Sequence, residues 1–557
     1  MPENDSDTVA FIKPGCTGYY ENGEYGKSLF SRKTAIAGCF SDGTICTPLS
    51  PAERRGNAPC VRLFTVVLPC SCGAYGSRRR CVLAIVTGVS KRRKSYERQE
   101  VVDLEYEGRG IIKPGGVVVF VDDVLPGEIV DVHVYRWKKS FGYARVTHRH
   151  TDSPDRIAPF CRHFEHCGGC KWQYLPYERQ VAWKEAFIRQ IYRSIASGVD
   201  LPDMEPLLAA PADRRYRNKL DFSFSSRRWL TPEEIAGGEV FDDRSALGFH
   251  VRGHFDKVLE IEECHLQPEP SNEIRNAVAS FARAEGLCFF DPVANEGLLR
   301  SLIIRTTRDG QVMVIVVFGE RNDDDDADRV VGFLTDRFPA ITSLYTTVNV
   351  SRNDAIAHCT MEHRGGTPHI CENIDGLDLL IGPKSFFQTN PEQAERLYRL
   401  ILDWAQLDGS QTVHDIYCGT GSISLLAARH ARSVFGVESV EEAILGAREN
   451  AVRNGIGNCT FVTGEAEKVL RDGFPGDAGR PDLVIVDPPR AGLHPRMVDT
   501  LLAERPPRII YVSCKPSTQA RDVERLSQAY RVTRMRGVDM FPQTFHIECV
   551  VELTRAE

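Results

Sequence analysis

"VHDIYCGTGSISLLAARHA", residues 413–431, is an apolar run that meets a glycine-rich turn and continues in a helical pattern. A strand, a tight glycine turn and a helix form the unit from which doubly wound parallel sheets are built. Further apolar strands, spaced by helical stretches, follow in "SVFGVES", "CTFVTG", "DLVIVDPP" and "RIIYVSC". The sequence therefore predicts an α/β fold, with a doubly wound parallel sheet in a C-terminal domain at 376–557.

The glycine turn indicates a cofactor site. Gly419 and Gly421 allow a ligand to approach the backbone and the N-terminus of the following helix. Glu438 ends the next strand, about 20 residues further on, where an acidic residue can hold a ribose diol. The turn lacks the third glycine of a dinucleotide fingerprint. We therefore expect a nucleoside cofactor without a pyrophosphate, and S-adenosylmethionine fits best.

Cys514 follows the strand "RIIYVS" and precedes a Lys-Pro pair. An ordinary buried thiol is the commonest role of a free cysteine. If the strand ends at Ser513, however, Cys514 lies at the carboxyl edge of the sheet, where ligands bind in open α/β folds. Lys515 beside it is placed to stabilise a thiolate. We interpret Cys514 as a nucleophile rather than a core thiol or a metal ligand.

Two further strand ends carry acidic residues. In "DPPRAG", Asp487 is followed by two prolines, which make a stiff loop. Methyltransferases of exocyclic amines place an aromatic residue after such prolines to stack the base, whereas Arg490 stands here, which argues against N-methylation. Glu548 begins the last strand, where a carboxylate would face Cys514 across a substrate; taken by itself, the residue is better interpreted as a solvated residue at a strand edge.

"CRHFEHCGGC", residues 161–170, contains three thiols at a spacing typical of metal sites, Cys161, Cys167 and Cys170. A tetrahedral site needs a fourth ligand, and Cys264 is the expected partner. Zinc and an iron–sulfur cluster are both consistent with these ligands. His163 and His166 lie beside these cysteines, and histidine is a common zinc ligand, so zinc remains an alternative.

Composition sets the class of the protein. The chain has 557 residues, 42% of them hydrophobic and 26% charged, with a net charge of -7. No apolar run reaches the ~18 residues of a membrane helix, and the acidic N-terminus is no secretory signal. We expect a cytoplasmic protein without a membrane partner. The net charge requires any RNA contacts to be concentrated in local basic patches.

The rest of the chain divides into three expected regions. Residues 1–90 show no sustained periodicity; they form a small unusual module or a poorly ordered extension, and we favour the extension. Residues 91–152 read as short strands of an OB-like β-barrel. Residues 153–375 alternate strands and helices, as a central α+β domain. Two basic and aromatic stretches are candidate RNA faces, Arg214–Trp229 and a hairpin with Trp137, Lys138, Lys139, Phe141, Tyr143 and Arg145.

Taken together, the motifs resemble a known family. "IYCGTGSIS", "DPPRAG", "VSCKPSTQARD" and "HIECVVEL" are similar to the RNA uracil-5 methyltransferases, especially the 23S ribosomal RNA type. The barrel resembles the TRAM domain of that group, and the four cysteines resemble its [4Fe–4S] ligands. "GPKSFFQTN" resembles the segment that brings a glutamine to the cofactor. The resemblance covers about residues 95–557 and leaves out the first 90.

The resemblance implies specific roles. It implies S-adenosylmethionine-dependent methylation of uracil C5 in 23S ribosomal RNA by a monomer, with Cys514 adding to C6 and Glu548 removing the C5 proton. It also implies an iron–sulfur cluster on the four cysteines. The same chemistry on transfer RNA, and a non-catalytic iron–sulfur RNA-binding protein, are the alternatives. The residues implied to contact the cofactor are Gln388, Tyr417, Ser422, Glu438, Glu465 and Asp487.

Overall fold

The computed structural model describes residues 94–557 except 239, 242, 321–324 and 472, together with four strands nearer the N-terminus. Those strands are β1 (Ala10–Phe11), β2 (Ala35–Gly38), β3 (Arg62–Pro69) and β4 (Arg80–Thr87), in one sheet ordered β1-β2-β4-β3. The expectation for residues 1–90 otherwise lies outside the described residues and stays a prediction.

Six short strands form a curled sheet ordered β5-β9-β10-β8-β7-β6. The Val101 N–H donates to the Glu128 carbonyl and the Val102 N–H to the Ile111 carbonyl, so the chain crosses from one edge of the sheet to the other. The predicted barrel is thus confirmed as a curled, barrel-like sheet. Its strands are β5 (Ser95–Glu100), β6 (Asp103–Leu104), β7 (Gly110–Ile112), β8 (Val118–Val121), β9 (Ile129–Trp137) and β10 (Phe141–Thr151).

The central region is built on a seven-stranded sheet ordered β14-β13-β12-β15-β16-β17-β18. Helices α3 (Ser271–Ala284) and α4 (Asp326–Arg337) share one hydrophobic core with this sheet, and Phe281 stacks on Phe333 between them. The short helix α2 (Pro232–Gly237) lies between β12 and β13 in the chain. The strands are β12 (Lys219–Ser225), β13 (Ala246–His250), β14 (Val258–Glu260), β15 (Leu299–Thr306), β16 (Val312–Phe318), β17 (Ser343–Val348) and β18 (Glu362–Gly366).

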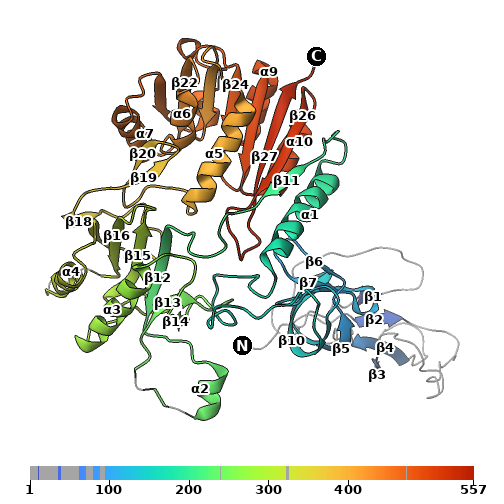
Figure 1. The fold of residues 1–557 in the computed structure, drawn as a ribbon. Helices are drawn as coiled ribbons and strands as arrows, with labels where there is room; N and C mark the ends of the chain where they lie inside the picture. The colour runs from blue at the N-terminus through green and yellow to red at the C-terminus, as the bar shows by residue number, and fades with distance from the viewer. Residues whose placement is uncertain are drawn as a thin grey trace. The chain divides into compact units, whose positions relative to one another are not determined.

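The C-terminal region has an eight-stranded sheet ordered β11-β26-β27-β25-β24-β21-β22-β23 (Figure 1). Neighbours among β21, β22, β23, β24 and β25 pair in parallel, whereas β27 runs antiparallel to β25 and β26. This is the predicted doubly wound sheet. Its strands are β11 (Glu205–Leu208), β21 (Thr412–Ile416), β22 (Ser433–Glu438), β23 (Cys459–Thr463), β24 (Leu483–Val486), β25 (Arg508–Ser513), β26 (Tyr530–Val538) and β27 (Glu548–Arg555).

Helices cover both faces of this sheet. One hydrophobic cluster joins it to α5 (Pro391–Ala405), α6 (Ser422–Ala428) and α7 (Glu441–Arg453), together with the hairpin β19 (Ile370–Ile374) and β20 (Leu377–Ile381). The other cluster joins it to the remaining helices, α1 (Tyr177–Ile195), α8 (Ala466–Val469), α9 (Pro495–Glu504) and α10 (Pro516–Leu526).

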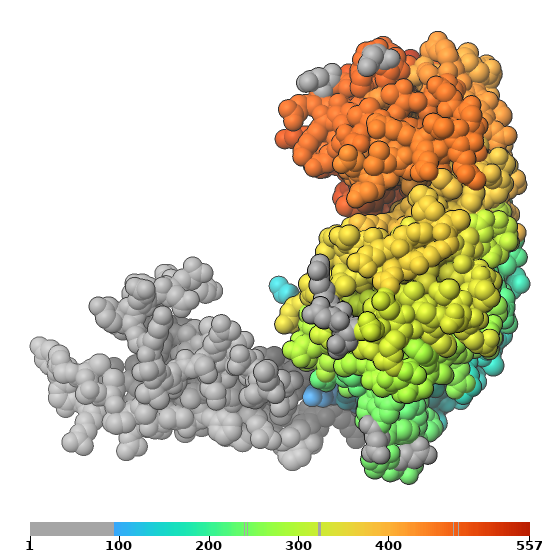
Figure 2. Space-filling model, turned by 90° about the vertical axis from the view of Figure 1, so that its left-hand side faces the viewer, coloured from blue at the N-terminus to red at the C-terminus, as the bar shows by residue number. Residues whose placement is uncertain are grey.

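Two elements of this C-terminal sheet come from far upstream in the sequence. Helix α1 packs on it, and β11 pairs with β26 in parallel, although both lie within the range 153–375 expected for the central domain. In the space-filling view the surface is hollowed where the orange C-terminal residues meet the yellow middle of the chain, and dark red residues are visible inside the hollow (Figure 2).

Candidate active site

The predicted catalytic and cofactor residues gather at one edge of the C-terminal sheet. Parallel strands place their carboxyl ends at the same edge, and the antiparallel β27 begins there. Each of five strands is followed or ended by a residue of the site, and β27 starts with one. These residues are Tyr417 after β21, Glu438 in β22, Glu465 after β23, Asp487 after β24, Cys514 after β25 and Glu548 in β27.

Cys514 and Glu548 are brought opposite each other by strand register. Ser513 of β25 pairs with Cys549 of β27, so the next position outward aligns Cys514 with Glu548. Directly opposed residues of an antiparallel pair have Cα atoms roughly 4.5–5.5 Å apart. The thiol is half-buried, whereas Glu548 is 4% exposed. A base placed between the two would meet both a thiol and a carboxyl group.

The electrostatics around Cys514 involve a cation that the sequence did not single out. Burial, followed by the nearby carboxylates of Glu548 and Asp487, raises the pKa of the Cys514 thiol to about 11. Arg490 opposes this shift, through its charge and a side-chain hydrogen bond. Lys515 is exposed and is not among the main causes of the shift. The cation beside the thiol is therefore Arg490, and the signal was its position directly after the strand-ending Asp-Pro-Pro.

Three buried carboxyl groups of the site influence one another's pKa in sequence, Asp415 acting on Asp487 and Asp487 on Glu548. Burial and then Asp415 raise the pKa of Asp487 to about 7. Burial also raises the pKa of Asp415 to about 6, although the Ser424 hydroxyl donates to its Oδ2 at 2.5 Å. Burial and the charge of Asp487 raise the pKa of Glu548 well above its usual value. The ionised form of Glu548 therefore binds a proton strongly, as a catalytic base must, and it is this form that acts on the substrate.

The glycine turn leaves room for a nucleoside. Gly419 and Gly421 have φ of +55° and +82°, in the left-handed region. A Cβ at Gly421 would come within 3.1 Å of Ala447, whereas a Cβ at Gly419 would meet nothing within 4 Å. The Gly419 N–H donates to Oε2 of Glu438 at 3.2 Å, and the Val440 N–H donates to Oε1 at 3.0 Å. The open backbone and the fixed carboxylate suit a ribose.

The other predicted cofactor residues are placed differently from one another. Ser422 begins α6 at this turn, and Tyr417 just before it has φ of +71°. The backbone around Gln388 is held by Asn218, whose Nδ2 donates to the Gln388 carbonyl at 3.1 Å. Glu465 is half exposed and forms an ion pair with Lys468 at 2.7 Å. The turn and Asp487 thus form the compact part of the site, with Glu465 at its exposed margin.

The four predicted metal-binding cysteines share one neighbourhood. Cys170 is buried, and Cys161, Cys167 and Cys264 are partly buried. Burial, together with the charges of the other three thiols, raises the pKa of Cys170 to about 12. Within the described residues, no three such side chains are grouped as ligands of a single ion. The donor set is four thiols, which suits soft metals and iron–sulfur clusters.

The neighbouring histidines are engaged elsewhere. Nε2 of His163 accepts from the Glu262 N–H at 3.2 Å. The His166 ring lies 6.3 Å from the Trp229 ring, centroid to centroid. His163 therefore has one ring nitrogen occupied by a backbone N–H.

Both candidate RNA faces contain aromatic rings and cations that contact other groups of the protein. On the barrel, the rings of Phe120, Phe141 and Tyr143 pack together, with Arg109 over Tyr143. In the stretch Arg214–Trp229, Arg227 pairs with Asp291 at 2.8 Å, and Arg228 pairs with Glu234 at 2.5 Å. Arg214 and Arg215 remain about half exposed, at 52% and 51%.

No helix among the described residues is long and apolar enough to cross a membrane.

Comparison with known proteins gives consistent matches. The model of the tRNA (uracil-5-)-methyltransferase family matches residues 381–556. An uncharacterized RNA methyltransferase of Bacteroides thetaiotaomicron is 44% identical over 449 residues, covering 80% of this chain and 99% of the relative. One of Porphyromonas gingivalis is 43% identical over 465 residues, covering 82% and 99%.

A solved structure matches at similar coverage. It is the tRNA (uracil-54, C5)-methyltransferase of Pyrococcus abyssi in complex with S-adenosyl-L-homocysteine. Its sequence is 31% identical, its TM-score is 0.65, and the match covers 82% of this chain and 99% of that one. With these relatives matched almost end to end, the chain belongs to the RNA uracil-5 methyltransferase family and is an S-adenosylmethionine-dependent RNA methyltransferase.

Proposed function

We propose that Cys514 is the nucleophile and Glu548 the base of this methylation. The Cys514 thiolate adds to C6 of the target uracil, forming a C–S bond and leaving C5 as an electron-rich enolate carbon. Bound S-adenosylmethionine supplies the methyl group to that carbon. Glu548 then takes the C5 proton, the freed electron pair forms the C5–C6 double bond, and the C–S bond breaks to return the thiolate.

The observation that carries this proposal is the opposition of Cys514 and Glu548 across β25 and β27. The two reacting positions of uracil, C5 and C6, are adjacent ring atoms, so the thiolate and the base must approach one small region of the ring. Arg490 beside the thiol offers the positive charge that a thiolate and an enolate both require. The cofactor residues at the same sheet edge bring the methyl donor into the same space.

The test is methyl transfer by a Cys514→Ala variant. We expect no labelled methyl in RNA, with S-adenosylmethionine binding unchanged in a calorimetric titration, because the cofactor turn is untouched. Cys459→Ala is the matched control, since Cys459 is a half-buried thiol that begins β23, away from the site's edge. Turnover by Cys514→Ala would contradict the nucleophile assignment.

For the RNA we propose 23S ribosomal RNA, with a TRAM-type role for the barrel. The aromatic cluster at Phe120, Phe141 and Tyr143 supports the role of the barrel in RNA contact, because single-stranded RNA is bound by stacking on aromatic rings. Transfer RNA is the second candidate, favoured by the Pyrococcus abyssi enzyme, whose whole length matches this chain. Mass mapping of 5-methyluridine in both RNAs from a deletion strain decides between them.

We also propose that the four cysteines hold a [4Fe–4S] cluster. The support is the donor set: the charges of Cys161, Cys167 and Cys264 act on the Cys170 thiol, so four soft ligands lie near one another, as such a cluster requires. Anaerobically purified protein should be brown, with broad visible absorption that Cys170→Ser abolishes. A colourless protein with one bound zinc would overturn the proposal.

A further inference from the structure

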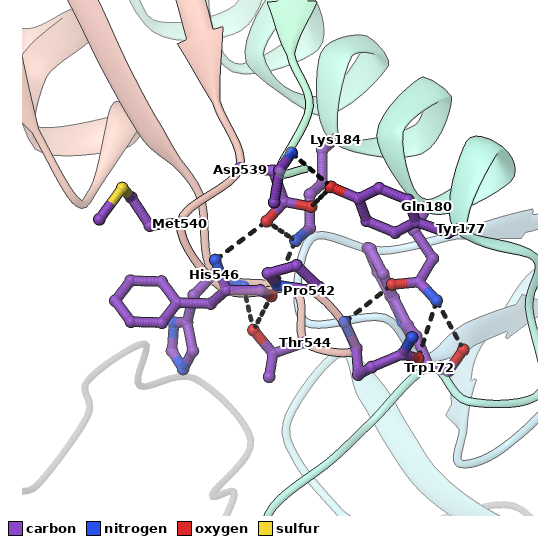
Figure 3. A network of polar contacts seen from close by, with 12 residues as sticks. Trp172, Tyr177, Gln180, Lys184, Asp539, Met540, Pro542, Thr544 and His546 are labelled. Atoms are coloured by element: carbon purple, nitrogen blue, oxygen red, sulfur yellow. Dashed lines mark hydrogen bonds and ion pairs between the residues drawn. The ribbon is translucent and has the colours of Figure 1, made fainter. Parts of the chain in front are cut away.

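Glu548 is reached through a loop whose polar groups are held by other parts of the chain. This loop, Asp539–Ile547, joins β26 to β27 and is here named the base loop. Many of the side chains that bond to it lie on or near α1, more than 300 residues earlier in the sequence. Figure 3 shows these side chains converging on the loop from the helix.

A buried ion pair holds the start of the base loop. Nζ of Lys184 donates to Oδ1 of Asp539 at 2.6 Å, and both side chains are 0% exposed. The same Nζ also donates to the Phe541 carbonyl at 3.1 Å. The Tyr177 hydroxyl donates to Oδ2 of Asp539 at 3.1 Å, and the Phe541 N–H donates to Oδ1 at 3.0 Å. Two α1 side chains thereby fix the first turn of the loop.

Paired glutamines hold the middle of the base loop. Nε2 of Gln180 donates to Oε1 of Gln543 at 3.0 Å, and the Gln543 N–H donates back to Oε1 of Gln180 at 2.9 Å. The Lys171 and Trp172 N–H groups both donate to the Gln543 carbonyl. Gln543 has φ of +66°, a conformation that a residue other than glycine keeps only when its surroundings enforce it. These bonds supply that enforcement.

The rest of the loop is tied at single points. The Tyr216 hydroxyl donates to the Pro542 carbonyl at 2.9 Å, and Nδ2 of Asn390 donates to the Met540 carbonyl at 3.2 Å. The Thr544 hydroxyl donates to the Phe541 carbonyl at 2.9 Å and accepts from the His546 N–H at 3.2 Å. The segment leading to Glu548 is thus held from its first residue to within two of the carboxylate.

Burying the ion pair of Lys184 and Asp539 costs free energy, because both charges lose their hydration. A fully buried lysine loses its hydration, and burial lowers the pKa of Lys184 while Asp539 raises it. Apolar residues of similar volume often stabilise a core as well as a buried pair does. Apolar residues do not fix the positions of particular groups, whereas an ion pair with further hydrogen bonds does. A function in placing the loop therefore accounts for Lys184 better than stability does.

We propose that Lys184 and Tyr177 of α1 are positioning residues for the catalytic base, holding the base loop so that Glu548 meets the C5 proton. The proposal rests on the role proposed for Glu548. It makes α1 part of the machinery of proton removal, although the helix is remote from the catalytic motifs in sequence. Neither side chain is a catalytic residue, since each acts through the loop.

The main test removes both charges together. In the double variant Lys184→Met, Asp539→Asn no charge is left unpaired, and the amide oxygen still accepts from the Phe541 N–H. We expect a melting temperature within a few degrees of wild type and an unchanged KM for RNA. We expect kcat to fall about 10- to 100-fold, as a displacement on the order of 1 Å produces. Methylated RNA should accumulate as a covalent adduct on denaturing gels, because methyl transfer precedes the step that Glu548 performs.

The matched control is Arg508→Met, Glu552→Gln. That pair joins β25 to β27 away from the base loop, and Arg508 also donates to the Ala405 carbonyl at 2.8 Å. The control should change kcat less than twofold and form no adduct. Wild-type kcat without an adduct in the Lys184 variant would overturn the proposal, as would an equal loss of kcat in both variants.

A milder pair of variants keeps the proposal testable if the double variant does not fold. Tyr177→Phe removes one hydroxyl from Asp539, and Tyr530→Phe removes a buried hydroxyl from the start of β26, where it donates to the Pro506 carbonyl at 3.1 Å. For Tyr177→Phe we expect kcat to fall about threefold and the adduct to be detectable, whereas Tyr530→Phe should show neither change. Equal kcat values and no adduct in the two variants would overturn the proposal. Glu548→Gln, assayed in parallel, separates the two claims: if it too forms no adduct, the proposed base has failed rather than the positioning.

Discussion

Asp539, which begins the base loop, and Glu548, which directly follows it, are two buried carboxyl groups with opposite surroundings. Asp539 accepts from Lys184, Tyr177 and the Phe541 N–H. Glu548 receives no side-chain hydrogen bond from the described residues, and its charged neighbours are Asp487, which raises its pKa, and Arg490, which lowers it.

The contrast separates a structural carboxylate from a chemical one. A buried carboxylate that is paired and hydrogen-bonded is stabilised in its charged form and fixes what it touches. A buried carboxyl group beside another acid binds protons tightly, at a cost in stability that only function explains. The fixed end at Asp539 and the reactive end at Glu548 thus have different roles. Substitutions at the two positions should therefore have different effects on stability and turnover.

The largest effect is expected for Glu548→Gln. The amide keeps the size of the side chain but cannot take the C5 proton, so turnover should fall at least about 10³-fold while the first methyl transfer survives. The measurement is a single-turnover assay with labelled methyl, followed by a denaturing gel for the protein–RNA adduct. Asp539→Asn should instead lower the melting temperature with a smaller loss of turnover. Identical behaviour of the two variants would contradict the separate roles of Asp539 and Glu548.

The next effect is the pH dependence of the rate. Glu548 acts as a base only when ionised, and its pKa is raised, so the rate of adduct breakdown should rise about tenfold per pH unit below that pKa. Asp487→Asn removes the negative charge that raises this pKa and should move the profile to lower pH. Single-turnover breakdown of preformed adduct between pH 5 and 9 measures both. A profile that does not move would mean that Asp487 has no influence on the base.

The sequence predicted the reactive end far better than the fixed end. Cys514, Glu438 and Asp487 were identifiable because each ends an apolar strand, and strand ends in a parallel sheet share one edge. Arg490 was interpreted only as evidence against N-methylation, because its influence on the thiol depends on how the loop after β24 folds.

The contacts of Asp539 could not be predicted from the sequence, for a different reason. Lys184 and Asp539 are 355 positions apart, and neither lies in a motif with a chemical meaning of its own. The placement of α1 and β11 on the C-terminal sheet is likewise tertiary, since their local patterns are those of any amphipathic helix and short strand. Local periodicity predicts elements and edges, whereas the partners of a buried polar side chain follow only from packing.

A third prediction concerns stability without cofactor. The pKa of Asp487 in the folded chain is raised to about 7, so its contribution is fully present below the unfolded-state pKa near 4 and is lost as pH rises through about 7. Asp487→Asn should therefore raise the melting temperature by about 2–4 °C at pH 8 and change it little at pH 4. Calorimetric scans at the two pH values test this, and a stabilisation equal at both would exclude ionisation as its cause.

The smallest effect should come from Thr544→Val, which tests how finely the fixed part of the loop is built. The change keeps the shape of the side chain and removes the hydroxyl that bridges the Phe541 carbonyl and the His546 N–H. Loss of such bonds costs about 1 kcal/mol, so the free energy of unfolding should fall by that amount in a denaturant titration. Turnover should fall less than about threefold, since Lys184, Gln180 and Tyr216 still hold the loop and a partly redundant set of bonds shares the constraint.

Thr533→Val is the control, because Thr533 bonds to Glu552 at the far end of β27 and should lower stability without lowering turnover. A loss of turnover from Thr544→Val as large as that of the Lys184 double variant would mean that the last tie before Glu548, rather than the buried ion pair, sets the position of the base.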